Sequence, residues 1–351
     1  MTMLTARIVA ALLLWVSLCH ASPVFAQDAD GDKVVESPAD RERRAAHVRD
    51  TLALADELAA QADARALALA AFLRATTLDG AAFAEGAQAY PPLDALAARW
   101  LSEAERRAPD DVAVLLMSLH QRGLDDPRHA ALISRWRALE PDNLAPLMHA
   151  RLSGHELFAA AASTTRFDLH YDDVIRAVIE TLSRHPYPAL KPLIARDAQE
   201  SLASYAASLG SLLWVVSAMP PFQSVAKPCR GESLPATRRQ QCRHIAQIMI
   251  ENSDIHIAES LGYSILTRAT DNAAEQSKGA EAKRVRDWLI LRTGELATRD
   301  MAAFCAEFVR LIRDTPQITE RALNERMLVD AGIDPTPSPG WQREDEPAPG
   351  L

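Results

Sequence analysis

The sequence is poor in glycine, aromatic side chains and cysteine. Its 351 residues include 13 glycines and four cysteines, and aromatic residues make up 5% of the chain. Scarce glycine leaves few positions for the left-handed turns that β-hairpins need. Scarce aromatics mean that Ala, Leu, Ile and Val must fill the core. We therefore expect an all-α protein whose helical hairpins stack as a solenoid or pack as an irregular bundle, with no substantial β-sheet.

Long apolar runs are also rare, and the clearest one stands at the N-terminus. Arg7 precedes the apolar run from Ile8 to Leu18, and the small residue Ala26 follows it. This order is typical of a secretory signal peptide, and the run is shorter than the roughly 20 residues that a membrane-spanning helix needs. We predict that residues 1–26 are a signal peptide cleaved after Ala26, and that the mature protein is periplasmic or secreted.

Two further segments raise the question of membrane attachment or insertion. Lipid attachment at Cys19 is an alternative to simple cleavage, but Leu18 stands where lipoprotein processing requires a small residue. Residues 201–226 carry no formal charge, yet their strongly apolar part, residues 212–216, is far too short to span a bilayer. We interpret this segment as a buried central helix and expect no stable membrane insertion after signal cleavage.

The chain lacks a basic block, and its formal net charge is −9. Removing residues 1–26, whose one formal charge is Arg7, takes the net charge to −10. Such a body repels phosphate backbones, so nucleic acid is not an expected partner. A Gly-rich phosphate loop is missing as well, and we expect no nucleotide or other cofactor.

Helical periodicity and Pro or Gly breaks divide the rest of the chain. We expect a flexible mature N-terminus over residues 27–37, a helical-repeat-like region over 38–221, a C-terminal helical region over 222–333 and a disordered Pro-rich tail over 334–351. Whether the C-terminal half forms a separate unit stays open. Ser37 is expected to cap the first helix, with Pro38 at its first position, and this helix continues through 41–61. Further helices are expected at 64–76, 174–182, 190–219, 238–251, 254–270, 281–296, 300–313 and 317–331. Residues 222–237 are expected to form a loop, and residues 271–279 are either a linker or a helix extension.

Two similar turns stand thirty-two residues apart. Pro109 is followed by two aspartates, and Pro141 by Asp142 and Asn143. Proline stops one helix, and an acidic or amide side chain after it can cap the next. A further break over residues 123–127 lies between the two turns, so the repeated unit is helix, turn, helix.

At these turns the chain resembles a tetratricopeptide repeat, over roughly residues 93–163. Ala104 stands five residues before Pro109, as the family pattern asks, whereas Trp136 holds the equivalent position before Pro141. The large, small and aromatic residues expected on a first helix are missing from 112–120. The resemblance implies stacked hairpins with a concave surface for peptides or proteins, and an irregular bundle is the alternative.

Three cysteines remain after processing: Cys229, Cys242 and Cys305. Thiols tend to pair in an oxidising compartment, so we predict a disulfide between Cys229 and Cys242. It would close a short loop against the apolar face of the helix that carries Cys242. Cys305 shares an apolar face with Phe304 and Phe308, and we interpret it as a buried thiol.

Metal and nucleophile patterns are incomplete. Cys229, Cys242, His244 and His256 match no common zinc spacing. His155 begins a zinc-protease pattern, but Ala159 stands where its second histidine is required. Ser224 and Lys227 have a serine-lysine spacing without the companion Lys-Thr-Gly. We predict no metal site.

One group of residues could supply acid-base chemistry: His170, Asp172, Asp173 and His185, which flank a single amphipathic helix. The two aspartates occupy its first turn, where carboxylates stabilise the helix dipole without any catalytic role. The sequence therefore assigns no catalytic residue.

These patterns favour a protein-protein interaction or scaffolding module of the cell envelope that binds a protein or peptide. The alternative is a helical envelope enzyme, a hydrolase or lyase acting on a polymer. An enzyme should show converging ionisable groups with shifted pKa values in a cleft, and a binding module should show a groove.

Overall fold

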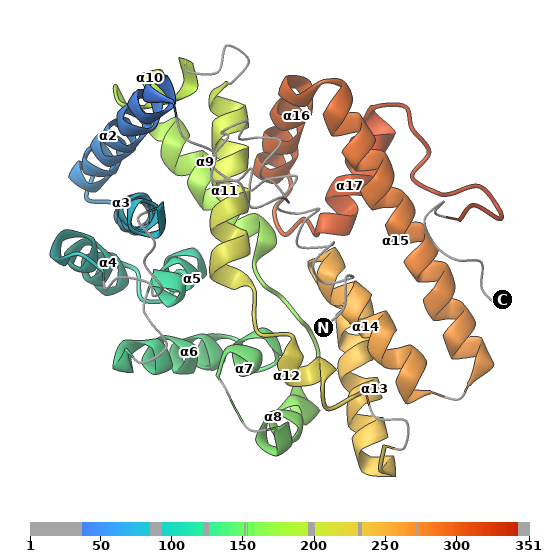
Figure 1. The fold of residues 1–351 in the computed structure, drawn as a ribbon. Helices are drawn as coiled ribbons and strands as arrows, with labels where there is room; N and C mark the ends of the chain where they lie inside the picture. Colours follow the sequence, from blue (N-terminus) through green and yellow to red (C-terminus); the bar gives the residue numbers. More distant parts are fainter. Residues whose placement is uncertain are drawn as a thin grey trace. The chain divides into compact units, whose positions relative to one another are not determined.

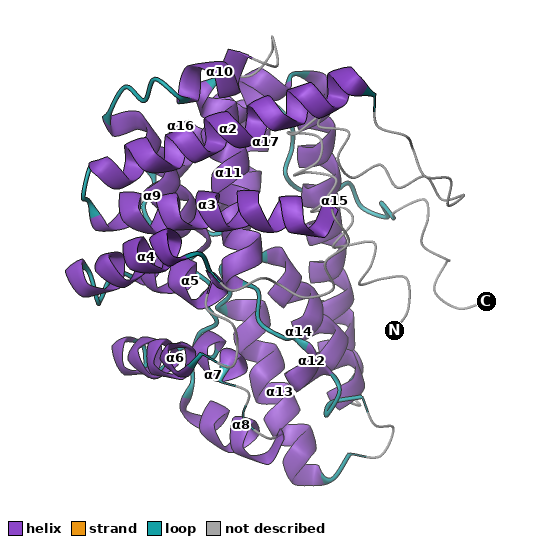
Figure 2. Cartoon of the chain, turned by 60° about the vertical axis from the view of Figure 1, so that its left-hand side comes forward, coloured by secondary structure: helices purple, strands orange, loops and turns teal. Residues whose placement is uncertain are grey.

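The structure, a computed structural model, describes residues 37–84, 93–121, 126–150, 152, 154–195, 201–230, 234–270 and 272–342. These residues form 16 α-helices, α2 to α17, and one 3-10 turn, η2 (Figures 1 and 2). In the same residues extended backbone pairs at two isolated bridges and forms no strand. The predicted all-α fold is confirmed. The expected signal peptide and most of the flexible N-terminus lie outside the described residues.

The chain divides into two compact units, each built from two stretches of sequence. Unit 1 comprises residues 1–129 and 174–217, and unit 2 comprises 130–173 and 218–351. Helices α6, α9 and α11 carry the chain across the divisions. The last crossing falls four residues before the expected start of the C-terminal region at Phe222.

Unit 1 is a set of paired helices around α3. Helix α3 packs against α2, α4 and α5, and α10 packs against α2 (Figure 1). Most of α9 and α11 also belongs to this unit. The bounds of these helices are α2 Pro38–Ala60, α3 Ala64–Ala84, α4 Ala95–Arg107, α5 Val112–Gln121, α9 Tyr171–Arg184, α10 Leu190–Ala195 and α11 Leu202–Ala218.

Helix starts in unit 1 follow the capping residues that the sequence indicates. The Ser37 hydroxyl accepts a hydrogen bond from the Asp40 backbone N–H at 3.1 Å, and Pro38 is the first helical residue of α2. Asp111, after Pro109, accepts from the backbone N–H groups of the second and third residues of α5. The predicted caps at Ser37 and at the first Pro-Asp turn are confirmed.

Two helix boundaries in unit 1 differ from expectation. Helix α3 runs to Ala84 through Gly80, where the sequence suggested a break after Thr76. A helical glycine costs only about 1 kcal/mol relative to alanine, and the alanine-rich flanks tolerate it. The single helix expected over 190–219 is two helices, because the Ser201 side chain caps a new start by accepting from the Ser204 N–H at 3.1 Å.

Helix α11 is largely buried, as expected for the uncharged segment. Gly210 allows its close approach to α9, since a Cβ there would lie 3.2 Å from the Ile175 Cα. None of the helices in the described part of the chain has the length and hydropathy needed to cross a membrane.

Unit 2 contains most of α6 and the helices from α12 onward. Helices α13 and α14 form a tight antiparallel pair, and α15 packs against α14, α16 and α17 (Figure 1). Gly262 permits the closest contact, because a Cβ there would stand 2.8 Å from the Ala246 carbonyl oxygen. The bounds are α6 Pro127–Leu139, α7 Ala145–His149, α8 Gly154–Ala160, η2 Ala161–Ser163, α12 Gln223–Ala226, α13 Ala236–Glu251, α14 His256–Ala269, α15 Ala273–Arg299, α16 Met301–Asp314 and α17 Glu320–Asp330.

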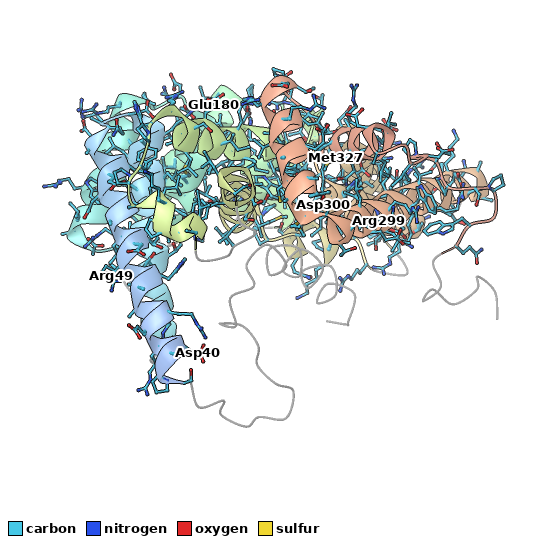
Figure 3. The ribbon with its side chains drawn as sticks, turned by 90° about the horizontal axis from the view of Figure 1, so that it is seen from above. Asp40, Arg49, Glu180, Arg299, Asp300 and Met327 are labelled. Atoms are coloured by element: carbon cyan, nitrogen blue, oxygen red, sulfur yellow. A yellow bond between two sulfur atoms is a disulfide. The ribbon has the colours of Figure 1, made fainter. Side chains whose placement is uncertain are left out.

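Three segments of unit 2 decide or correct an expectation. Helix α15 begins at Ala273, so the segment 271–279 is a helix extension from that residue on, and Asn272 caps it by accepting from the Ala274 N–H. Between α15 and α16, Asp300 follows Arg299 directly and caps the next helix (Figure 3). One helical turn, α12, interrupts the loop expected over 222–237.

The beginning of the tail, expected to be disordered from Asp334, contacts α15 instead. Trp341 packs edge-on against Trp288 with ring centroids 5.2 Å apart. The Trp288 indole N–H donates to the Asp334 carbonyl at 3.1 Å, and Arg284 donates to that of Ser338 at 2.9 Å. Contact between two large aromatic rings opposes the disorder that the prolines suggest. Residues 343–351 lie outside the described part.

Candidate functional site

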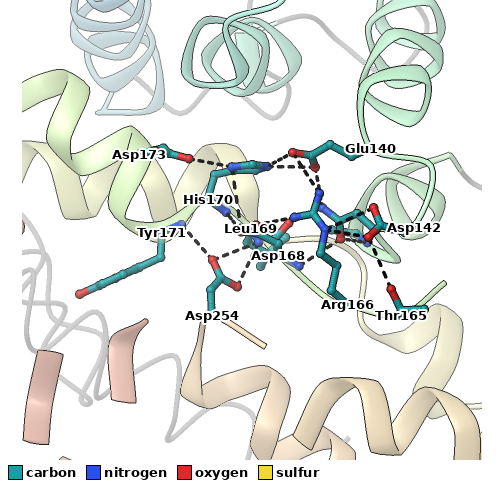
Figure 4. Close-up of polar contacts among 12 residues, drawn as sticks. Glu140, Asp142, Thr165, Arg166, Asp168, Leu169, His170, Tyr171, Asp173 and Asp254 are labelled. Carbon is teal, nitrogen blue, oxygen red and sulfur yellow. Dashed lines mark hydrogen bonds and ion pairs between the residues drawn. The ribbon is translucent and has the colours of Figure 1, made fainter. Parts of the chain in front are cut away.

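A cluster of charged side chains lies where an extended segment of unit 2, residues 164–170, passes between two turns (Figure 4). On one side, the Leu144 N–H donates to the Arg166 carbonyl at 2.9 Å. On the other, the Phe167 N–H donates to the Asn252 carbonyl at 2.9 Å. The segment thus joins the turn between α6 and α7 to the turn between α13 and α14, and we call the charged side chains around it the His170 cluster.

The His170 imidazole stands at the centre of the cluster, held between two carboxylates. Its Nε2 lies 2.9 Å from a carboxylate oxygen of Glu140, and its Nδ1 lies 2.9 Å from that of Asp173 (Figure 4). Only 7% of the His170 side chain is exposed. Its backbone has a φ of 54°, in the left-handed region that non-glycine residues seldom adopt. In this conformation carboxylates satisfy both ring nitrogens.

The two carboxylates fix the charge of the imidazole. Burial opposes a charged ring, but hydrogen bonds to Asp173 and Glu140 outweigh it and raise the pKa of His170 to about 10. Burial would raise the pKa of Glu140, but the contact with His170 and further hydrogen bonds from Asn143 and Trp136 lower it to about 2. The pair is therefore an imidazolium and a carboxylate across the physiological pH range.

Arg166 supplies the second cation and reaches three acids. Its Nη1 lies 2.6 Å from the Asp168 carboxylate, its Nε 3.3 Å from Asp142 and its Nη2 3.4 Å from Glu140. The amide of Asn143 completes this side by donating to Glu140 and to the Asp168 carbonyl, both at 2.8 Å. The residues after Pro141 thus bind the extended segment as well as starting α7.

Asp254 clamps the strained residue from the other side. Its carboxylate accepts from the Leu169 N–H at 3.0 Å and from the Tyr171 N–H at 2.9 Å, the two amides that flank His170. Although Asp254 as a residue is only part-buried, this backbone encloses its carboxylate. Desolvation, together with the nearby charge of Asp168, raises the pKa of Asp254 to about 8.

This arrangement is better suited to a structural role than to acid-base catalysis. A general acid or base works best with a pKa near the operating pH, whereas His170 keeps its proton to about pH 10. Both of its ring nitrogens are occupied by carboxylates of the protein itself. The cluster therefore acts as an ionic tie between three stretches of chain.

The structure brings together only part of the group that the sequence suggested. His170 and Asp173 are in contact, while Asp172 turns away and accepts from the Gln317 N–H at 2.7 Å. His185 lies beyond the opposite end of the 14-residue helix α9, about 20 Å away at 1.5 Å of rise per residue. Instead its ring contacts Tyr187.

The sequence does not identify five members of the cluster as neighbours of His170: Glu140, Asp142, Asp168, Asp254 and Arg166. Asp142 carried a signal, but only as a cap after Pro141. The others come from segments up to 114 residues apart, and no local spacing connects them.

A second buried group in unit 2 surrounds His256, at the start of α14. Its Nε2 lies 3.0 Å from the Asn324 side-chain nitrogen, and its Nδ1 lies 3.5 Å from the Glu259 carboxylate. Arg321 of α17 binds both oxygens of Glu259, at 3.0 and 2.6 Å. This bidentate pair fastens α17 to α14.

The predicted disulfide between Cys229 and Cys242 is confirmed, with the two Cα atoms 5.9 Å apart. Its sulfurs are thereby unavailable as zinc ligands, and His244 contacts the Ala161 carbonyl at 3.2 Å. The Cys305 thiol is buried and takes no part in this disulfide. Among the residues that the structure describes, no three His, Cys, Asp or Glu side chains are grouped so as to hold a metal ion.

The described helices also place the two Pro-Asp turns in register. Helices α4 and α6 each have 13 residues and begin 32 residues apart, at Ala95 and Pro127. Ala104 and Trp136, the equivalent positions on these helices, are both 0% exposed.

In comparisons with known proteins, no family model, no curated protein and no solved structure matches the chain.

Proposed function

We propose that the chain is an exported protein-protein interaction or scaffolding module of the cell envelope, built from degenerate tetratricopeptide-like helix pairs. One observation carries the proposal: α4 and α6 have equal lengths and a 32-residue offset, and each ends at the same kind of Pro-Asp turn. Helix pairs repeated at this period commonly present side chains from successive helices to a bound segment.

The disulfide supports the extracytoplasmic part of the proposal. Both half-cystines are buried, at 1% and 0% exposure, and such bonds form and persist mainly in oxidising compartments. This agrees with a signal peptide over residues 1–26. After cleavage at Ala26, we propose a soluble periplasmic or secreted protein.

The polar interior supports binding over catalysis. In the His170 cluster, His170, Glu140 and Asp173 are engaged with one another. Their charges thus hold the chain together. An acidic chain with a net charge of −9 also makes nucleic acid an unfavourable partner.

Export and binding can be tested in one experiment. A C-terminally tagged chain is expressed in a Gram-negative host, and osmotic shock, N-terminal sequencing and crosslinked pull-down from envelope extract follow. We expect release with the periplasmic fraction, a mature N-terminus at Gln27 and a stoichiometric protein partner. Retention in the cytosol with residues 1–26 intact would contradict the export, and reproducible absence of a specific partner would contradict the binding role.

The second candidate is a helical envelope enzyme acting on a polymer, and the meeting of His170 with two carboxylates is what favours it. If it holds, the purified protein should release soluble fragments from peptidoglycan or envelope polysaccharide, and His170→Gln should abolish the release. As a control, Arg49→Gln, on the exposed side of α2 (Figure 3), should leave the release unchanged. Our proposal expects no release by any of these proteins.

A further inference from the structure

An open hollow lies on unit 1 between α3 and α4. Its volume is about 400 Å³, and one residue of α3, Leu67, lines it. The remaining lining residues all belong to α4: Arg99, Trp100, Ser102, Glu103 and Arg106. Because four of these stand at positions i, i+3, i+4 and i+7, they share one face of the helix.

The rim of the hollow carries more positive than negative charge. Glu103 is its one acid, and it is shared by Arg106, whose Nε lies 2.9 Å away, and by Arg107 at 2.6 Å. Hydrogen bonds from these two arginines lower the pKa of Glu103 to about 2, so its single charge is already engaged. From the start of α6, Arg128 donates to the Ser102 hydroxyl at 2.7 Å.

Among the described residues that line the hollow, Arg99 has no acid paired with it. The side chain is exposed, and it makes no hydrogen bond or ion pair with any residue in the described part of unit 1. Beside it the hollow is lined by two apolar side chains that are largely buried, Trp100 and Leu67, at 8% and 4% exposure. Arg74 lies over the Trp100 ring, 5.9 Å from its centroid, and pairs with Asp94 at 2.8 Å.

We propose that this hollow is a docking site for an acidic, extended segment of a partner protein. One carboxylate of the segment pairs with Arg99 and a second lies near Arg106 and Arg128. A neighbouring apolar side chain rests on Trp100 and Leu67. This inference rests on the proposed binding function and assigns it a surface and a class of partner.

Charge complementarity selects this occupant. The chain carries a net charge of −9, so a cationic hollow with an unpaired arginine is a local exception that attracts carboxylates. An anionic bilayer is a poorer fit, because juxtamembrane binding draws on a cluster of basic residues and the acidic body would be repelled. The open form suits one or two side chains of a peptide better than an enclosed small molecule.

The test uses the purified mature chain and three fluorescein-labelled decapeptides that differ only at four positions, occupied by Glu, Gln or Lys. Leu, Gly and Ser fill the remaining positions. Fluorescence anisotropy should show that the Glu peptide binds at least about fivefold more tightly than the other two, with affinity falling as salt increases. Arg99→Gln should weaken this binding about fivefold, and the double variant Arg99→Gln/Arg106→Gln should weaken it further.

Arg49→Gln is the matched control, since Arg49 is also an exposed arginine, with 71% of its side chain accessible, but lies on α2 outside the hollow (Figure 3). It should bind like the wild type, and unchanged circular dichroism should show that every variant is folded. Equal binding of the three peptides, no binding of the Glu peptide up to about 1 mM, or an unaffected Arg99→Gln variant would each overturn the proposal.

Two further outcomes separate this site from the general function. In a flotation experiment with phosphatidylglycerol vesicles, the protein should stay unbound. Flotation that depends on Arg99 would show that the hollow binds a lipid surface, and the peptide proposal would be wrong. If wild type and Arg99→Gln capture the same envelope partner equally, the binding function stands and the hollow is the wrong surface.

Discussion

The two units bury different kinds of polar group. In the described part of unit 1, the buried polar side chains are hydroxyls and one imidazole: Thr51, Ser118, His129, Thr181, Ser204, Ser208, Ser211 and Ser217. In unit 2 they include carboxylates, a guanidinium and two imidazoles: Asp172, Glu259, Asp287, Arg286, His170 and His256. Unit 1 keeps its long-range ion pairs partly exposed, such as that of Arg65 with Asp111 at 2.7 Å.

This difference shows two ways of holding helices together. In unit 1 the apolar stretch of α3 from Ala66 to Leu73 is buried throughout, so the packing of Ala and Leu side chains supplies the stability. In unit 2 short helices and turns meet around charges that burial makes costly unless they are paired. The stability of unit 1 should therefore depend little on pH, and that of unit 2 should depend on it strongly.

The largest effect is expected from a cavity in unit 1. Leu69→Ala, at a position 1% exposed on α3, should lower the free energy of unfolding by about 3.5 kcal/mol. Because no charge is removed, the loss should be the same at pH 5 and pH 9. Urea unfolding followed by circular dichroism measures it, and a loss that changes with pH would break the comparison.

A loss of about 3 kcal/mol is expected for His170→Gln in unit 2, because the variant removes the buried cation that lies between Glu140 and Asp173. The pKa of His170 is raised in the fold, from 6.5 to about 10. Its contribution is therefore complete below about pH 6.5 and disappears as the pH rises through 10. The gap between the two unfolding free energies should thus narrow in alkali, and a constant gap would argue against the imidazolium.

The disulfide should contribute a similar amount within unit 2. Replacing both Cys229 and Cys242 with alanine should cost about 3 kcal/mol, since the bond closes a loop over a sequence separation of 13. A reduced wild-type sample is the control and should match the double variant. If the oxidised wild type and the variant have the same free energy of unfolding, the disulfide adds no stability beyond the packing around α13.

The smallest effect at any single step is a change of stability from one pH unit to the next, which accumulates over several units. The pKa of Asp254 is raised from 3.8 to about 8, so the folded chain holds a proton there that the unfolded chain has lost between these values. Wild type should therefore lose stability relative to Asp254→Asn as the pH rises from 4 to 8, by about 1 kcal/mol per pH unit. Parallel pH profiles for the two proteins would show that desolvation of this carboxylate has no effect.

The sequence predicts the parts of this fold that depend on neighbouring residues. The α-helical class, the caps at Ser37 and Asp111 and the disulfide follow from composition, turn chemistry and cysteine spacing. A helix end is wrong where a breaker is overruled, as at Gly80 inside α3. Whether residues 271–279 are helical stays open in the sequence, and the cap at Asn272 before α15 decides it.

The His170 cluster could not be predicted, because its members meet only after distant segments have packed. Glu140 and Asp254 stand 114 residues apart, and each alone resembles an ordinary surface acid. Proximity in sequence identified Asp173 as a neighbour of His170 but also suggested Asp172, which binds elsewhere. Spacing also says nothing about the left-handed backbone at His170, which Asp254 stabilises through the two adjacent amides.

The central claim is that His170 is a permanent structural cation. A ¹⁵N NMR titration of the histidine side chains, with His170→Gln to assign its signal, tests it most directly. We predict that the His170 imidazole stays protonated through neutral pH and titrates near pH 10. Titration near its ordinary value of 6.5 would contradict the account and return His170 to the candidates for acid-base chemistry.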